Sequence, residues 1–180
     1  MAPVSASPLA SPVPGSPPKD PQTVIRPARE GTVRVLKAAA AEFVGRLRMA
    51  DRELSVLVVT DRAIRALNKQ WRAKDKATDV LSFGLAASRK PRAARPEAIG
   101  DVVISLDTAR RQAREGGWTL RVELRRLLAH GLLHCLGHDH EAAGQAKRMA
   151  RAERSLLGEE GMVGAAFSTG LKSGPRSRSF

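Results

Sequence analysis

The chain has 180 residues and is 42% hydrophobic, which suits one domain with a buried core, and no apolar run approaches the roughly 20 residues of a membrane span. The single cysteine excludes an internal disulfide, and the lack of a signal-peptide pattern favours a cytoplasmic protein without membrane contact. The formal net charge of +13 favours a polyanionic partner such as nucleic acid, although a generally basic protein would explain it equally well.

The two ends of the chain differ in composition from the middle. Residues 1–25 are rich in Pro, Ala and Ser and carry no net charge, so we predict a disordered extension there. Residues 163–180 carry three basic residues and no acidic one, which predicts a flexible basic tail. A single domain is expected over residues 26–162, where a net charge of +10 remains.

Hydrophobic periodicity within this domain alternates between helical and strand patterns. In chain order we predict a helix over Val33–Ala50, a strand over Leu54–Val59, a helix from Asp61 to about Trp71, a strand over Asp79–Phe83, a cationic loop over 84–98, a strand over Asp101–Ser105, a helix that Asp107 caps and Gly116–Gly117 ends, a helix that Thr119 opens, and a last helix over about Glu141–Leu157. This order predicts an α/β (α+β) fold in which helices cover a small mixed sheet.

The four histidines of the chain lie within eleven residues, at His130, His134, His138 and His140. His130 and His134 are four residues apart, so a helix places them on one face, where they can share a metal ion. Gly137 suits the left-handed turn that ends a helix and can bring His140 towards the same ion. Three imidazoles with one open position are typical of a hydrolytic zinc site. The alternative is a helix end that is rich in histidine by chance.

The same spacing occurs in the metzincin peptidases, H-E-x-x-H-x-x-G-x-x-H. Those enzymes carry a glutamate after the first histidine as their general base. Gly131 stands at that position here. The sequence therefore predicts a similar metal geometry with a different chemistry.

Three segments resemble the signature blocks of the YbeY family, the bacterial single-strand-specific endoribonucleases of rRNA maturation. They are LNKQWRAKDKATDVLSF (Leu67–Phe83), IGDVVIS (Ile99–Ser105) and HGLLHCLGHDH (His130–His140), in the family's order. The resemblance covers roughly Val33 to Leu157 and implies that residues 26–162 form a catalytic domain. Two departures are plain, because the family usually has tyrosine at the position of His138 and an aliphatic residue at that of Cys135.

The resemblance also implies a site and its partners. It implies one zinc ion held by His130, His134 and His140, and a catalytic role for these histidines and for Arg72. It further implies that the partners are rRNA precursors and the ribosome or its proteins, with no DNA expected. An arginine fork suits the charge that develops on phosphoryl oxygens. Metal hydroxide and the adjacent 2′-hydroxyl both remain possible nucleophiles.

Several other side chains have two interpretations. Arg72, without the resemblance, would be an ordinary exposed arginine. Glu123 lies two turns before His130 on the same helical face, so it is either an outer carboxylate of the metal site or a solvated carboxylate. Trp71 could stack a base, but core packing is the stronger expectation. For the whole chain, the alternative to a nuclease is a metal-stabilised RNA- or ribosome-binding maturation factor without turnover.

Overall fold

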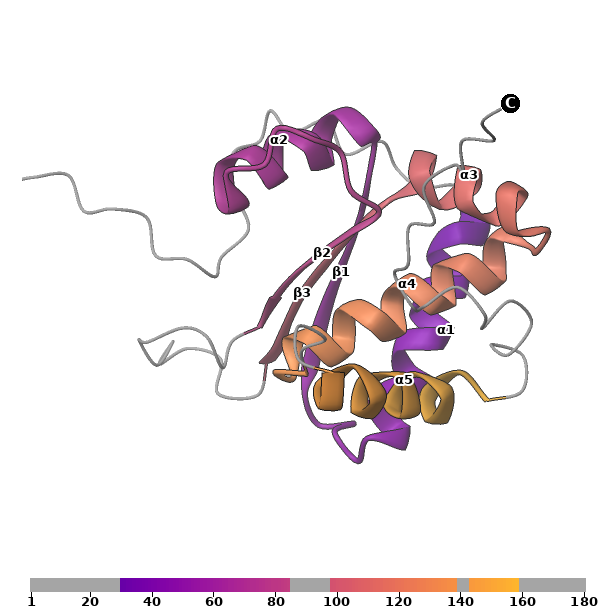
Figure 1. The fold of residues 1–180 in the computed structure, drawn as a ribbon. Coiled ribbons are helices and arrows are strands. Elements are labelled where there is room, and N and C mark those ends of the chain that lie inside the picture. The colour runs from indigo at the N-terminus through magenta and orange to yellow at the C-terminus, as the bar shows by residue number, and fades with distance from the viewer. Residues whose placement is uncertain (1–29, 85–97, 139–142, 159–180) are drawn as a thin grey trace, which may run out of the picture.

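The computed structural model describes residues 30–84, 98–138 and 143–158. The predicted extension (1–25), the basic tail (163–180), almost all of the cationic loop and His140 lie outside these residues. Within them the chain forms α1 (Glu30–Arg46), β1 (Glu53–Val59), α2 (Asp61–Arg72), β2 (Val80–Gly84), β3 (Ala98–Ser105), α3 (Leu106–Gly116), α4 (Leu120–Cys135) and α5 (Ala143–Leu157) (Figure 1). This order of elements confirms the predicted one. None of these helices has both the length and the apolar character that a membrane crossing requires.

The three strands form one mixed sheet in the order β1-β3-β2. β1 pairs with β3 in parallel, and β2 pairs with β3 in antiparallel. β3 is therefore the central strand, and it contains the most continuous run of buried residues. The small mixed sheet predicted from the sequence is confirmed.

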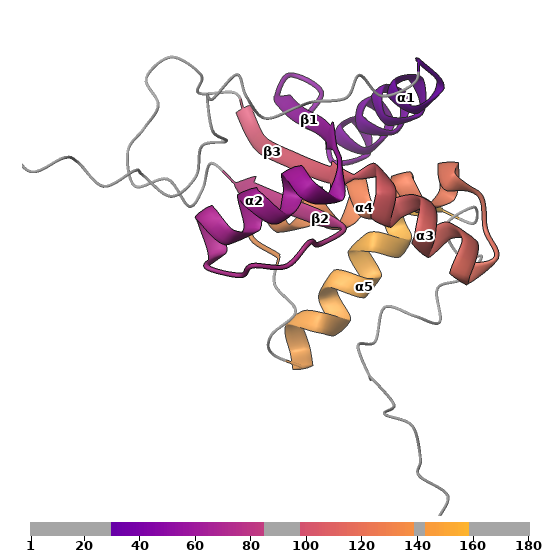
Figure 2. The ribbon, with the colours of Figure 1, turned by 90° about the horizontal axis from the view of Figure 1, so that it is seen from above.

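Helices cover both faces of the sheet. Successive residues of β3 point to opposite faces, so they pack against different helices. Val102 and Ile104 of β3 belong to a large core cluster with α1, α4 and α5, whereas Val103 belongs to a smaller cluster with α2. Figure 1 shows α2 on one side of the sheet and α1, α4 and α5 on the other, and Figure 2, seen from above, shows α2 lying over the strands. Leu128 and Leu132 of α4 are completely buried in the large cluster, and burial of such a side chain stabilises by about 1.5–3 kcal/mol.

Two predicted helix ends are wrong for local reasons. The first helix ends at Arg46 rather than near Ala50, because Arg48 adopts a left-handed conformation with φ 56°. The N-cap of α3 is Ser105, whose side chain accepts a hydrogen bond from the backbone of Thr108, and not Asp107. Asp107 instead accepts a hydrogen bond from the backbone N–H of Asp61, so it helps to satisfy the first turn of α2.

Candidate metal centre

The histidine-bearing helix α4 begins and ends with well-formed caps. Thr119 caps its N-terminus and accepts a hydrogen bond from the backbone of Val122, as predicted. At the other end Gly137 has φ 84°, and the backbone N–H groups of Gly137 and His138 donate to the carbonyls of His134 and Leu133. These two bonds form a Schellman motif, which ends the helix and turns the chain directly after the second histidine.

His130 and His134 are brought together on one side of α4. Their Nε2 atoms lie 3.1 Å apart, and their rings meet edge to face with centroids 4.6 Å apart. Both side chains are half-buried, so the pair lies at the surface of the core and not within it. The structure therefore places the two ring nitrogens close enough to bind one metal ion, as the helical spacing predicted.

This geometry fits a metal ion. Two ligand nitrogens at about 2.0–2.1 Å from a tetrahedral zinc ion are separated by about 3.3 Å, which is close to the observed 3.1 Å. Within residues 30–84, 98–138 and 143–158 no cluster of three potential ligands is found. The predicted third ligand, His140, lies outside those ranges, so the three-histidine set stays a prediction.

The other ring nitrogen of His130 contacts a carboxylate that the sequence did not predict. His130 Nδ1 lies 2.7 Å from Oε1 of Glu153 in α5. Metal-binding histidines commonly donate this second N–H to a carboxylate, which orients the ring. Glu153 lies 23 positions away on another helix, and no helical spacing connects it with His130.

Glu123, the carboxylate that helical spacing suggested, has other partners. Its side chain accepts hydrogen bonds from Trp118 Nε1 at 2.6 Å and from Arg126 at 3.5 Å. The residue is only 4% exposed, so the expectation of a solvated carboxylate is wrong. Burial raises the pKa of the Glu123 carboxyl above its ordinary value, and the hydrogen bond from Trp118 opposes that shift. Glu123 thus serves the packing between the start of α4 and the preceding turn.

The glycine between the two histidines packs against the sheet. A Cβ on Gly131 would lie 2.7 Å from Val102 Cγ1 and 3.2 Å from Val80 Cγ2. Real Cβ atoms are essentially never found at the shorter of these distances. A glutamate therefore cannot occupy this position without moving α4, which excludes the metzincin arrangement of the general base.

Arg72 is the last residue of α2 and is exposed. Its Nη2 donates a hydrogen bond to the backbone oxygen of Ser82 in β2 at 3.4 Å. Ser82 lies between Val80, which faces Gly131, and Gly84, which packs against the backbone at the end of α4. β2 thus runs beside the histidine-bearing half of α4 and also binds Arg72.

Comparison with known proteins assigns the family. The sequence profile described as Endoribonuclease YbeY matches residues 21–161. A protein of that name from Myxococcus xanthus is 57% identical over 131 residues, which are 72% of this chain and 44% of that protein. Another, from Anaeromyxobacter sp., is 52% identical over 144 residues, or 80% of this chain and 73% of that protein. This chain belongs to the endoribonuclease YbeY family.

The YbeY match contains all three segments that carried the resemblance in the sequence. The chain spans less than half the length of the Myxococcus relative, but 93% of an Endoribonuclease YbeY from Thermus thermophilus, to which it is 42% identical. A protein from Thermotoga maritima with a solution structure is similar at 25% identity, with a TM-score of 0.49, and 84% of this chain and 96% of that chain are covered.

Three further side chains of this YbeY chain have structural roles. Trp71 packs edge to face on Phe83, with ring centroids 6.0 Å apart, in the smaller core cluster, as expected. Asp79 accepts hydrogen bonds from the backbone of Val80 and from Gln112, so it fixes the start of β2. Cys135 is buried, and burial raises the pKa of its thiol to about 12.

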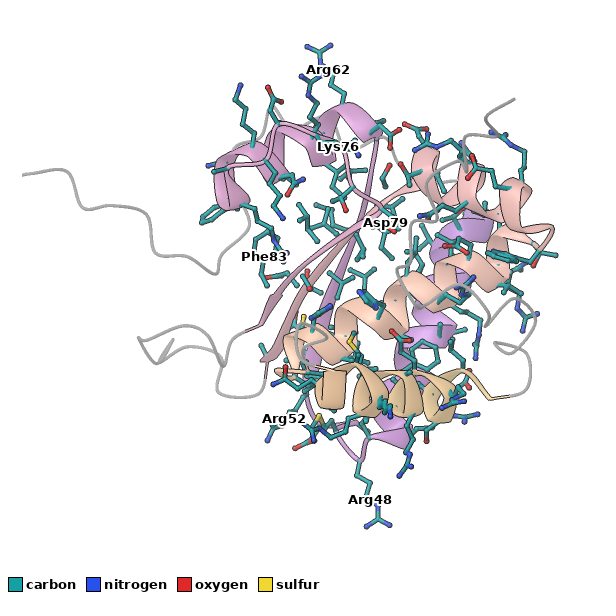
Figure 3. All side chains as sticks on the ribbon, viewed as in Figure 1. Arg48, Arg52, Arg62, Lys76, Asp79 and Phe83 are labelled. Atoms are coloured by element: carbon teal, nitrogen blue, oxygen red, sulfur yellow. The ribbon has the colours of Figure 1, made fainter. Side chains whose placement is uncertain are left out.

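Within the described residues, exposed basic side chains occur at opposite ends of the molecule. Figure 3 shows Arg62 and Lys76 on the α2 side, and Arg48 and Arg52 at the opposite end. All four are exposed. Near α2 part of the charge is neutralised, because Asp75 pairs with Arg65 at 2.7 Å and with Lys69 at 3.1 Å. These hydrogen bonds lower the pKa of Asp75 to about 2.

Proposed function

We propose that this endoribonuclease depends on one zinc ion held by His130, His134 and His140, and that it acts on single-stranded regions of rRNA precursors during ribosome maturation. The observation that carries the zinc proposal is the convergence of two Nε2 atoms at 3.1 Å on adjacent turns of α4. The Schellman turn at Gly137 supports the proposal that His140 is the third ligand, because this turn ends the helix three residues before His140.

A zinc ion with three imidazole ligands acts as a Lewis acid and lowers the pKa of a bound water to about 7. The protein supplies the arrangement around it. His130 and His134 present their Nε2 atoms, and Glu153 contacts Nδ1 of His130 on the far side of its ring. Gly131 lets α4 lie directly on the sheet, so the two histidines have a rigid support.

Arg72 is the proposed cationic group of the reaction. Its guanidinium binds the edge of β2 through a single 3.4 Å hydrogen bond and is otherwise exposed, so it can contact a phosphodiester. A guanidinium presents several N–H donors in a planar fork, which matches the geometry of phosphoryl oxygens. In this role Arg72 would stabilise the negative charge that develops during cleavage.

The substrate and partner are inferred from charge and family. A positively charged surface attracts the RNA backbone without regard to sequence, which suits a nuclease that works on a large ribonucleoprotein. The charged residues on both ends of the molecule support contacts with more than one stretch of RNA (Figure 3). We therefore propose pre-rRNA as the substrate and the ribosome, or its proteins, as the partner.

The test measures metal content and RNA cleavage on one preparation. We expect close to one zinc ion per chain, cleavage of single-stranded RNA, and loss of cleavage with a chelator. His134→Ala should lose both zinc and cleavage. His138→Ala is the matched control, because it removes a histidine of the same turn that is not in the proposed ligand set, and it should retain both. Tight RNA binding without products would instead favour a maturation factor that has no turnover.

A further inference from the structure

We infer that Glu153 is the positioning residue of the metal site, which holds the ring of His130 so that its Nε2 atom faces the ion. This inference rests on the proposed zinc site. It adds a residue from α5 to a proposed site whose two described ligands, His130 and His134, lie on α4.

The contact is short and sheltered. Glu153 Oε1 lies 2.7 Å from His130 Nδ1, and the Glu153 side chain is only 14% exposed. In α5 it occupies the face that packs against the core, because Met149 and Leu156, four residues before it and three after it, are buried in the large cluster. The carboxylate is therefore held in place by the packing of its own helix.

The chemistry of imidazole makes this contact specific. A neutral histidine has one ring nitrogen with a hydrogen and one with a free lone pair. A carboxylate at Nδ1 accepts a hydrogen bond, so it favours the form with the hydrogen on Nδ1 and the lone pair on Nε2. That lone pair is the one directed towards His134 Nε2. Glu153 thus selects the form of His130 that can bind a metal ion together with His134.

The contact also gives α5 a role beyond covering the core. The helix follows the segment that contains the predicted third ligand, and its own docking is secured by a hydrogen bond from Arg46 to the backbone of Ser155. The Glu153 side chain is only 14% exposed, and its contact with His130 offsets part of the cost of its desolvation.

The experiment compares zinc affinity in the full-length protein and three variants, measured by competition with a chromophoric chelator. Glu153→Ala should weaken zinc binding by about 10- to 100-fold, the usual effect of losing such an outer carboxylate. Glu115→Gln removes an exposed carboxylate of α3 and should leave the affinity unchanged. Arg46→Ala loosens α5 without removing the carboxylate, so it should change the affinity far less than Glu153→Ala.

A second readout separates positioning from simple docking of α5. Long-range ¹H–¹⁵N NMR spectra report which ring nitrogen of His130 carries the hydrogen in the metal-free protein. We expect hydrogen on Nδ1 in the parent and a mixture of both forms in Glu153→Gln, which keeps the size of the side chain if Glu153→Ala fails to fold. Unchanged zinc affinity together with an unchanged ring form would overturn the inference. If the parent binds no zinc, the proposed function fails, while the ring form of His130 still decides the role of Glu153.

Discussion

Replacement of Gly131 by alanine tests how closely α4 must approach the sheet. The added Cβ would lie 2.7 Å from Val102 Cγ1, and Val102 is completely buried and β-branched, so its methyl cannot rotate away. Overpacking of this kind costs about 1–3 kcal/mol, whereas alanine in a helix interior is favoured over glycine by about 1 kcal/mol. We therefore expect Gly131→Ala to lower the free energy of unfolding by about 1 kcal/mol, because the clash outweighs the helix preference.

Gly45→Ala in α1 is the matched control. A Cβ at that position meets nothing within 4 Å, so only the helix preference acts. The variant should be more stable than the parent by up to about 1 kcal/mol. Urea denaturation of the metal-free proteins, with equal slopes required for a valid comparison, gives both values.

The opposite signs of these two effects are the decisive result. If Gly131→Ala stabilises the protein as much as Gly45→Ala does, the close approach of α4 to Val102 is not a constraint and the reasoning fails. A double-mutant cycle locates the clash, because Val102→Ala should be less harmful when Gly131 is already alanine. Zinc affinity should fall with Gly131→Ala as well, since any displacement of α4 moves the neighbouring histidines.

Four further predictions concern other parts of the molecule. Arg72→Ala should slow single-turnover RNA cleavage by about 10²–10³-fold and leave zinc content and melting temperature unchanged; Arg72→Lys should recover little, and a parent-like rate would remove the residue from the reaction. Glu42, whose pKa is lowered mainly by the hydrogen bond from Arg125, should stabilise the fold above its ordinary pKa of 4.5, and that stability should disappear as the pH falls below this value. Melting curves should therefore show a smaller acid-side loss in Glu42→Gln than in the parent, and equal losses would contradict the pairing. The thiol of Cys135, with a pKa of about 12, should resist alkylation at pH 8 in the folded protein and react only after denaturation. RNA affinity should weaken steeply with salt, since several phosphates release counterions on binding, and a flat dependence would show that the net charge does not contribute.

Local patterns were sufficient to predict most of this fold. The apolar run in residues 101–105 and the apolar stripe before His130 predicted a strand and a helix, and both lie where they were expected. Helix caps were harder, because Asp107 and Ser105 are both good capping residues and only the tertiary structure decides which helix each one serves.

The proposed metal site shows the same limit. Helical spacing predicted that His130 and His134 meet, and it made Glu123 one candidate for an outer carboxylate of the site. The structure uses Glu123 to bind Trp118 and brings Glu153 to His130 from another helix. Periodicity describes neighbours within one helix, so it cannot reveal a partner that arrives through the packing of α5 on α4.

The placement of the charged groups explains why similar histidine spacing can serve a different chemistry. Peptide hydrolysis by metzincins uses a glutamate after the first histidine, but the close contact of Gly131 with Val102 leaves no room for one here. The carboxylate that does reach the site, Glu153, lies at Nδ1 of His130, on the far side of the ring from the two converging nitrogens. It can orient a ligand but does not lie where a general base would act. Cleavage of a phosphodiester requires stabilisation of developing negative charge, and this is the role that we propose for Arg72 at the edge of β2. In the proposed site, an orienting carboxylate and an exposed arginine therefore favour an anionic substrate over a peptide.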